Sequence, residues 1–492
     1  MNKLITKIVM IAGTAWLLTS CKKDKWLNPV PTTAISDASA FDTPDRILAQ
    51  VNGLYAATRS GQFLGGRYHI YGDIRGEEFI NMLTNGVTGL QTWNHTLNSN
   101  ANEVTGLWNA GYQAINQYNL FLDGMIAKGN SIVGTALANN YNAEARFLRG
   151  LTYFSLLQLY ARPYWDNPTK NPGLPLRLTG NKGRGSGDLV RSPVDSVYQQ
   201  IIADLDFAEA NLPLNYSTAI LNTTRAHRNT AIAFKTRVYL AMRKYDKVIT
   251  EANKIVSASA PFTATSGVAH SLQGDVANVY KTFTTTESIF SMPFTTAAGD
   301  VPGTQNQLGH YYSPTKIGTA NGGNGEYSLN PAGIISNAGW TAADRRRTFI
   351  YTHTDNKQYL IKWPSPSPFP DWVPVIRYAE VLLNLAEALV RQNNTVDARA
   401  VALLNAVRNR SDATTTYTVA SFADATALIN AILIERRIEL LGEGFRSFDL
   451  LRLGLPIPAK GTATGISPTQ SEYIWPISAQ ELLNNKLAVP NP

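Results

Sequence analysis

The sequence predicts a mostly α-helical fold: an α/α superhelix of tetratricopeptide-like hairpins that carries one large insertion of irregular loops and short strands. Two observations support this prediction. Before residue 257 and after residue 375, apolar residues recur at spacings of three and four, in paired segments with Ala and Leu on the facing stripes. Between these parts the helical period is lost, and Gly, Thr, Ser, Asn and Pro dominate.

Residues 1–20 have the pattern of an export signal. Lys3 and Lys7 precede an apolar run over residues 8–18, which is too short to span a membrane as a stable helix. Small residues then lead to Cys21, the only cysteine of the chain. This arrangement resembles the lipobox of bacterial lipoproteins, in which the cysteine is acylated and becomes the new N-terminus. The alternative is an ordinary signal peptide with a chance cysteine. Two or three acyl chains would anchor the protein stably.

Composition limits the kind of protein that this anchor would hold. Residues 21–40 are polar and contain Pro29 and Pro31, as a tether would. The chain has 492 residues, enough for a large core, and a net charge of +8 without any Lys/Arg tract. Nucleic acid is therefore not expected as a partner. After Cys21 no cysteine remains, so the mature chain has neither disulfides nor a thiolate nucleophile.

The first predicted unit, residues 41–257, contains the best-defined helices. Thr43 is expected to cap a helix that has Pro44 in its first turn. Ser192 before Pro193 repeats this pattern and predicts a second capped helix. Apolar spacing predicts further helices over residues 103–126, 141–160, 228–243 and 245–257.

Residues 258–374 form the predicted insertion. A non-helical stretch of this length in a compact chain is usually functional or disordered. Strand-like runs occur at residues 287–294 and 358–363. Large aromatic side chains argue against disorder; they are Tyr311, Tyr312, Trp340, Phe349, Trp363 and Trp372.

The last predicted unit, residues 375–492, is helical again and carries the clearest motif. An apolar stripe from residue 376 to residue 390 predicts one helix, with residues 395–409 returning beside it. Residues 434–441 (IERRIELL) predict another helix, which ends at Gly442 in a left-handed cap.

Two glutamates of this motif pose an electrostatic problem. Glu435 and Glu439 lie one helical turn apart, which destabilises a helix unless arginines intervene. We expect Arg436, Arg446 and Arg452 to provide the opposite charge.

The motif over residues 434–452 resembles the C-terminal signature of the SusD/RagB family, the surface glycan-binding lipoproteins of Bacteroidetes. Further matches occur in family order over essentially the whole mature chain. They are the lipobox at Cys21, AEARFLRG at 143–150 before Tyr153-Phe154, Asp204-Leu205, RYAEVLL at 377–383 with AEA at 386–388, Leu404-Asn405 with Arg408, and Trp475-Pro476-Ile477. These motifs identify the scaffold but not the ligand.

The resemblance implies both a fold and a function. It implies that residues 41–492 form one compact SusD-like unit of helical hairpins with an irregular face. Family members bind oligosaccharides outside the cell and cover a TonB-dependent transporter of the SusC type, to which they pass the glycan without breaking a bond. The chain is therefore expected to be a lipid-anchored, surface-exposed protein of the outer membrane that needs no cofactor.

Sugar recognition requires particular side chains, because a sugar ring offers an apolar face and equatorial hydroxyls. Residues 71–77 (YGDIRGE) and 91–95 (QTWNH) supply an aromatic ring with charged and amide groups, in the part of the family sequence where ligand residues commonly occur. The candidate ligand residues are Asp73, Arg75, Trp93, Asn94, Tyr311, Tyr312 and Trp340. For each aromatic residue core packing is the alternative, and Trp108, Trp165 and Trp475 are interpreted as structural.

A glycoside hydrolase is the enzyme alternative. It needs two carboxylates about 5–9.5 Å apart, and Asp73 with Glu77, or Glu435 with Glu439, could be proposed. Asp73 and Glu77 could equally bind hydroxyls, while arginines would lower the pKa of the other two, the wrong direction for a general acid. We therefore predict no catalytic residue.

Other functions receive less support from the sequence. The six histidines show no paired ligand spacing, so no metal site is predicted. Residues 180–187 lack the lysine-hydroxyl ending of a phosphate loop. A tetratricopeptide scaffold that binds only protein remains the alternative function. The net charge of +8 is compatible with an acidic glycan but too diffuse to identify one.

Overall fold

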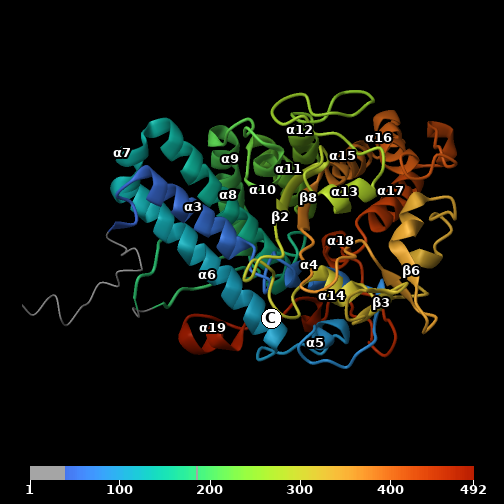
Figure 1. Ribbon diagram of the computed structural model, residues 1–492, viewed down its shortest axis with the longest axis horizontal. Helices are drawn as coiled ribbons and strands as arrows, with labels where there is room; N and C mark the ends of the chain where they lie inside the picture. Colours follow the sequence, from blue (N-terminus) through green and yellow to red (C-terminus); the bar gives the residue numbers. More distant parts are fainter. Residues whose placement is uncertain (1–38, 184–186) are drawn as a thin grey trace, which may run out of the picture.

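Helices make up most of the regular secondary structure, which confirms the predicted class (Figure 1). The structure is a computed structural model that describes residues 39–183 and 187–492. The predicted signal peptide, the lipidation site Cys21 and nearly all of the tether lie outside the described residues. No helix in the described parts of the chain is both long and apolar enough to cross a membrane.

The N-terminal helices begin and end close to where the sequence predicts. Helix α3 (Pro44–Thr58) has Thr43 as its cap, whose side-chain oxygen accepts a hydrogen bond from the Arg46 amide at 3.3 Å. Helices α6 (Asn102–Gly124) and α8 (Thr135–Tyr160) cover two predicted segments. The expected Ser192 cap is wrong: the position before α9 (Val194–Asn211) is Pro193, and no side chain caps this helix.

The helices pack as successive neighbours, which is the arrangement of a superhelix. Helix α8 lies between α6 and α9, and α9 packs against α11 (Arg228–Ala241). The series continues through α12 (Tyr245–Ala252) to α15 (Tyr378–Asn393), which α16 (Ala398–Asn409) and α17 (Ala425–Glu439) cover. Figure 1 shows helices α3, α6 and α8 on one side of the molecule and the outer strands β3 (Lys316–Ile317) and β6 (Ile350–Thr352) of the insertion on the other.

The insertion contains short antiparallel strand pairs. Strand β2 (Ser288–Met292), within a predicted strand-like run, pairs with β8 (Val373–Arg377). The expected helix from residue 376 is therefore corrected: Ile376 belongs to β8, and α15 begins only at Tyr378. The remaining pairs are β1 (Phe79–Asn81) with β5 (Tyr327–Leu329), β3 (Lys316–Ile317) with β4 (Ala320–Asn321), and β6 (Ile350–Thr352) with β7 (Gln358–Leu360).

Aromatic packing joins the insertion to the helices. Phe290 of β2 meets Phe147 of α8 edge to face, with ring centroids 5.5 Å apart. Tyr312 of α14 (Leu308–Tyr312) stacks on Phe79 of β1 at 4.7 Å. One connected hydrophobic cluster runs from Ile47 to Ile477 and includes all three predicted units.

The C-terminal motif forms a buried ion-pair cluster. Glu435 and Glu439 of α17 are almost completely buried. Arg346 donates to Glu435 at 2.5 Å and to Glu439 at 2.9 Å, and Arg377 donates to Glu439 at 2.9 Å. Burial alone would raise the pKa of Glu439, but Arg410, Arg377 and Arg346 lower it well below its ordinary value. The predicted lowering of the pKa of Glu439 is thus confirmed, although the arginines that lower it differ from those expected.

The three arginines expected beside these glutamates pair elsewhere. The observed pairs are Arg436 with Asp449, Arg446 with Glu77, and Arg452 with Glu387. One residue along a helix is a rotation of about 100°, so Arg436 faces away from the side that Glu435 presents to the insertion. It donates instead to Asn384 of α15 at 2.6 Å.

Candidate functional site

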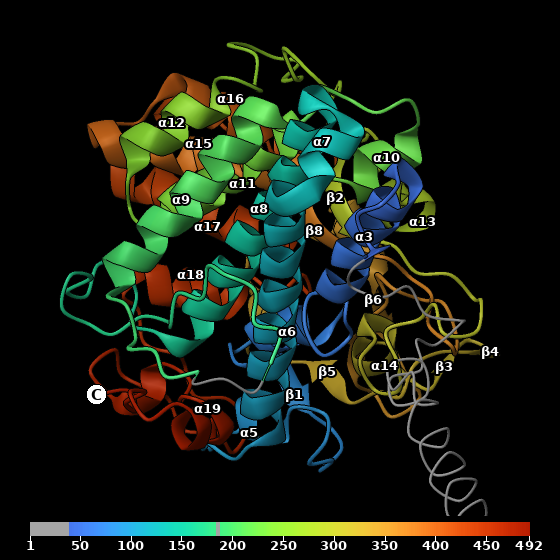
Figure 2. The same ribbon diagram turned by 90° about the vertical axis from the view of Figure 1, so that its left-hand side faces the viewer.

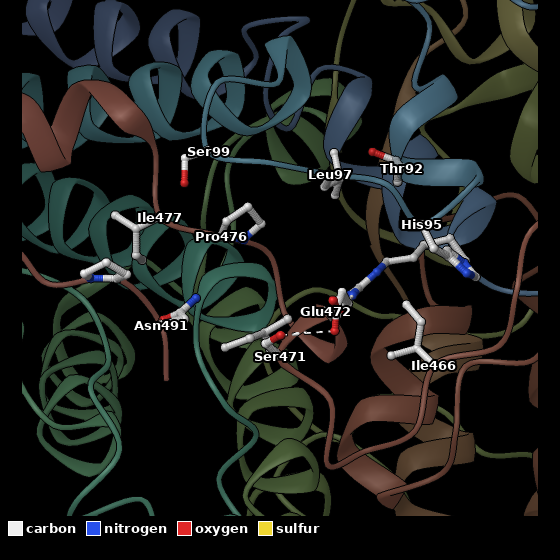
Figure 3. Close-up of a pocket in the computed structure, with 13 residues that line it drawn as sticks. Thr92, His95, Leu97, Ser99, Ile466, Ser471, Glu472, Pro476, Ile477 and Asn491 are labelled. Atoms are coloured by element: carbon white, nitrogen blue, oxygen red, sulfur yellow. Dashed lines mark hydrogen bonds between the residues drawn. The ribbon is translucent and has the colours of Figure 1, made fainter.

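A cleft of about 200 Å³ lies where the loop after α5 (Leu90–Trp93) meets the C-terminal segment of the chain (Figure 3). Figures 1 and 2 place α5 close to the lower edge of the molecule, on the side where α19 (Ala479–Asn484) lies. Apolar and polar groups line the cleft in similar proportion. The lining residues are Arg75, Thr92, His95, Leu97, Ser99, Ile466, Ser471, Glu472, Ile474, Pro476, Ile477, Pro490 and Asn491.

Arg75 is the buried cation of this cleft. It comes directly after α4 (Arg67–Ile74), and its side chain is 2% exposed. One terminal nitrogen, Nη2, donates to the backbone oxygen of Glu472 at 2.6 Å, while Nη1 is buried without a hydrogen-bond partner. Among the described residues no carboxylate lies within ion-pairing distance of this guanidinium. Burial lowers the pKa of Arg75 to about 10.

Lys460 lies beneath the same wall. Its Nζ donates to the backbone oxygens of Ile74, Arg75 and Gly76, at 2.5, 2.8 and 2.6 Å. These carbonyls end α4, so the ammonium group completes the hydrogen bonding that a helix C-terminus leaves open and interacts favourably with its dipole. Burial lowers the pKa of the lysine well below its ordinary value. Like Arg75, Lys460 has no carboxylate partner in the described part of the chain.

His95 connects this pair of cations to the loop. Its Nδ1 lies 2.7 Å from the backbone oxygen of Thr464, and its Nε2 lies 3.4 Å from Lys460 Nζ. Nε2 also lies 2.9 Å from the backbone oxygen of Arg75, and a neutral ring, which carries one N–H, donates to only one of the two carbonyl oxygens. Burial, with Lys460 nearby, lowers the pKa of His95 to about 4, so the ring is uncharged at neutral pH.

Three of the residues predicted to bind ligand meet close to this cleft. Arg75 lines it, and Asn94 adjoins it on the loop after α5, where its side chain accepts from Thr96. Trp93 is buried beneath the loop, with its ring 5.9 Å from Lys460 Nζ and its indole nitrogen donating to Phe79 at 2.8 Å. The sequence-based prediction thus places three candidate residues at or beside the cleft, but Trp93 does not present a ring face to solvent.

Asp73 has a structural contact instead of an exposed position. Its carboxylate accepts from the backbone amides of Gly444 at 2.7 Å and Arg446 at 3.1 Å, and it thereby joins α4 to α18 (Arg446–Leu453). Burial raises the pKa of Asp73 to about 7. The other half of the proposed hydrolase pair, Glu77, is bound by Arg446 and Arg437. Neither carboxylate lines the cleft.

The aromatic residues predicted in the insertion are buried away from the cleft. Tyr311 and Tyr312 are completely buried, the first stacked on Tyr327 at 6.0 Å. Trp340 packs under the Arg347 guanidinium, 4.4 Å from its ring centroid. The expectation of exposed aromatic plates is therefore corrected for these three residues, because their ring faces are used in packing. Their part in ligand binding stays a prediction.

Several cleft residues have no local signal in the sequence. Thr92 is fully buried with an unpaired hydroxyl, and Glu472 is an exposed carboxylate at the polar end of the cleft. Figure 3 shows His95 and Glu472 at this end, and Pro476, Ile477 and Asn491 at the other. Residues so far apart in the chain share no periodicity, and only the tertiary fold brings them together. Over residues 39–183 and 187–492, no three His, Cys, Asp or Glu side chains are grouped to hold a metal ion.

Comparison with known protein families gives two matching regions. Residues 25–240 match a SusD-like family described as starch-binding and associating with the outer membrane. Residues 370–492 match the SusD family. A relative, SusD-like protein P2 of Formosa agariphila, is 25% identical over 94% of both chains.

Solved structures share the whole fold. A SusD superfamily protein from Bacteroides fragilis is 33% identical with a TM-score of 0.79, and the match covers 91% of this chain and 99% of that chain. A protein described as a laminarin binding SusD-like protein has a TM-score of 0.70 at 20% identity, with 92% of this chain and 99% of that chain covered.

Proposed function

Because the chain belongs to the SusD/RagB family, we propose that it is an outer-membrane lipoprotein that binds oligosaccharides at the cell surface and delivers them to a SusC-type TonB-dependent transporter. The observation that carries most weight is the 33% identity and 0.79 TM-score with the SusD superfamily protein, over nearly the full length of both chains. A laminarin-binding protein among the structural neighbours supports a carbohydrate as ligand. The cleft at Arg75 is the proposed contact site for that ligand.

The proposal includes no bond-breaking step. Asp73 and Glu77 are held by backbone amides and by arginines, and neither lines the cleft. Glu435 and Glu439 are enclosed in the buried ion-pair cluster. Both carboxylate pairs therefore have structural roles that leave no acid and base facing one ligand.

Isothermal titration of the full-length protein in detergent against plant, fungal and host glycans tests the binding. We expect saturable binding to at least one glycan, with no release of reducing sugar. Absence of binding across the panel, together with tight association with a transporter, would favour the scaffold alternative. Reducing sugar released by highly purified protein, and abolished in Asp73→Asn, would contradict the non-catalytic role.

The anchor is tested separately at Cys21. A Cys21→Ala variant is expected to lose palmitate labelling and to leave the membrane fraction, because the acyl chains supply the membrane affinity. If the variant kept both its label and its membrane location, the proposed anchor would be wrong.

A further inference from the structure

The charges around the cleft are unbalanced. Most buried guanidinium groups of this protein contact carboxylates; Arg346, for example, donates to Asp344, Glu435 and Glu439. Arg75 is equally buried, yet in the described part of the chain it has no such partner, and its Nη1 makes no hydrogen bond. Leaving a buried donor on a charged group unpaired is more unfavourable than leaving a neutral one unpaired.

Neighbouring groups do not supply the missing negative charge. Lys460 adds a second buried cation, which donates to three backbone carbonyls and lies 3.4 Å from His95 Nε2. The carboxylate of Glu472 is exposed and accepts from Ser471 at 3.1 Å. Two buried cations therefore stand beside the cleft, and in the described part of the chain neither forms an ion pair, although Glu77 attracts Lys460 from beyond ion-pairing distance.

A second unpaired group faces the same space. Thr92 lines the cleft and is fully buried, and its hydroxyl has no hydrogen-bond partner. A hydroxyl donates one hydrogen bond and accepts others. Together with the unpaired Nη1 of Arg75, this hydroxyl complements a ligand that carries both an oxyanion and hydroxyl groups.

The size and lining of the cleft limit the ligand further. Drug-sized ligands occupy pockets of about 300–1,000 Å³, so a cleft of about 200 Å³ holds roughly one sugar ring. Leu97, Ile474 and Pro476 give it an apolar wall suited to the C–H face of such a ring.

We propose that the cleft binds the terminal, negatively charged sugar of an acidic glycan, with its oxyanion on Arg75 and a hydroxyl on Thr92. This rests on the proposed glycan binding and specifies its substrate class. The oxyanion is a uronate carboxylate or a sulfate ester, because a guanidinium group pairs with either. Glu472, at the polar end, opposes the same anion and thereby sets an upper limit on affinity.

The test compares charged glycans with matched neutral ones by titration of the full-length protein in detergent. The probes are trisaccharides ending in galacturonate, glucuronate or mannuronate, their methyl esters, and a singly sulfated galactotriose with its unsulfated form. We expect at least one acidic probe to bind at least about tenfold more tightly than its neutral form, as a charge-assisted hydrogen bond provides. Preference for the sulfated probe identifies sulfate as the source, and preference for a uronate identifies carboxylate.

Two variants locate the effect. Arg75→Met is expected to abolish the preference for the charged form, whereas Arg347→Met, which removes a half-buried arginine far from the cleft, should keep it. Glu472→Gln removes an exposed opposing charge, and it should tighten binding of the acidic probe several-fold while leaving its methyl ester unchanged. This second variant is informative even if Arg75→Met fails to fold.

The outcomes separate this inference from the proposed function. Equal affinity for charged and esterified probes, or binding of neutral glycans only, overturns the inference and leaves glycan binding intact. A Glu472→Gln variant that weakens binding of the acidic probe also overturns it. Failure to bind any glycan, acidic or neutral, overturns both.

Discussion

Two regions of this protein bury positive charge in opposite ways. In the ion-pair cluster around α17, the arginines meet carboxylates; Arg377, for example, donates to Glu287, Glu439 and Glu443. At the cleft, Arg75 and Lys460 donate to backbone carbonyls and have no carboxylate partner in the described part of the chain. The arginines of the cluster are paired with carboxylates of the protein, whereas the anion that would pair with Arg75 is the ligand proposed above.

The difference shows that a conspicuous charged motif in the sequence need not be a binding site. The charged residues of the α17 motif are easy to recognise, but they satisfy one another inside the core. A charged group that is buried and unpaired at the wall of a cleft is a candidate for ligand binding. Substitutions that change one region at a time can therefore test whether the cluster and the cleft differ as their contacts indicate.

The largest loss of folding stability is expected from a substitution in the ion-pair cluster. Glu439→Gln keeps the shape of the side chain but removes the charge that Arg346, Arg377 and Arg410 share. Breaking a buried pair leaves unpaired charge and costs about 3–5 kcal/mol. Urea unfolding monitored by circular dichroism measures the loss.

The control for this variant is Asp246→Asn, in an exposed pair with Lys247 at 4.0 Å. It should change the free energy of unfolding by less than about 1 kcal/mol. A Glu439→Gln protein as stable as wild type would show that the ion pairs of Glu439 add nothing to stability. The cluster and the cleft would then not differ in the way that their contacts indicate.

The next prediction concerns the pH dependence of folding stability, to which a pair of histidines buried without charged partners contributes. The rings of His227 and His270 stack at 5.3 Å. Burial, and the neighbouring His270, lower the pKa of His227 to about 3, and burial lowers that of His270 to about 4. Because these values lie below the unfolded value of about 6.5, the unfolded state takes up protons first as the pH falls. Stability should be level above pH 6.5 and fall between about pH 6.5 and 4, by on the order of 3 kcal/mol for each ring.

His227→Phe keeps a buried aromatic ring and removes one titration. Its free energy of unfolding should therefore decline less steeply between pH 6.5 and 4, as measured by urea titrations at several pH values. Glu443, in the ion-pair cluster, titrates at a lower pH than these histidines. Burial alone would raise the pKa of Glu443, but Arg377 and Lys362 lower it to about 2. Stability from this carboxylate is present above pH 4.5 and is lost as the pH falls toward 2. An unchanged slope in His227→Phe would assign the acid sensitivity to other groups.

Much of the scaffold could be predicted from the sequence, because its signals are local. The Thr43 cap, the end of α8 before Pro163 and Gly442 at φ 83° depend on residues within a few positions of one another. Apolar spacing assigns Ile376 to the wrong element because a short apolar run fits a buried strand as well as a helix. Its pairing with Phe290 of β2 lies far away in the sequence.

The site was predictable only in part. Side-chain chemistry and family position place Arg75, Trp93 and Asn94 at or beside the proposed cleft. Their burial was not predictable, because it depends on Lys460 and on Glu472, which the tertiary fold brings to α4. The same holds for the cluster, where the partners of α17 come from the insertion, as Arg346 does.

The next prediction concerns Trp93, which lies between core and cleft, and the smaller effect is expected from its conservative variant. Trp93→Phe removes the indole donor to Phe79 and should cost about 1 kcal/mol, whereas Trp93→Ala should cost about 3–5 kcal/mol through the cavity it leaves. Thermal unfolding measures both. A large loss of glycan affinity in fully folded Trp93→Phe would place the ring in the binding surface; a stability loss without that change would place it in the core.

The last comparison deletes two hydroxyls, one in each kind of environment, and the smallest effect on stability is expected at Tyr312. Tyr280 donates to Glu443 at 2.7 Å, so Tyr280→Phe removes a bond to a buried charge and should cost about 1.5–3 kcal/mol. The Tyr312 hydroxyl is buried without a partner, so Tyr312→Phe should change stability by less than about 0.5 kcal/mol or increase it. Parallel urea titrations compare the two variants. If Tyr312→Phe costs as much as Tyr280→Phe, that hydroxyl is satisfied in solution, and an unpaired buried group in this fold would no longer indicate a site awaiting a ligand.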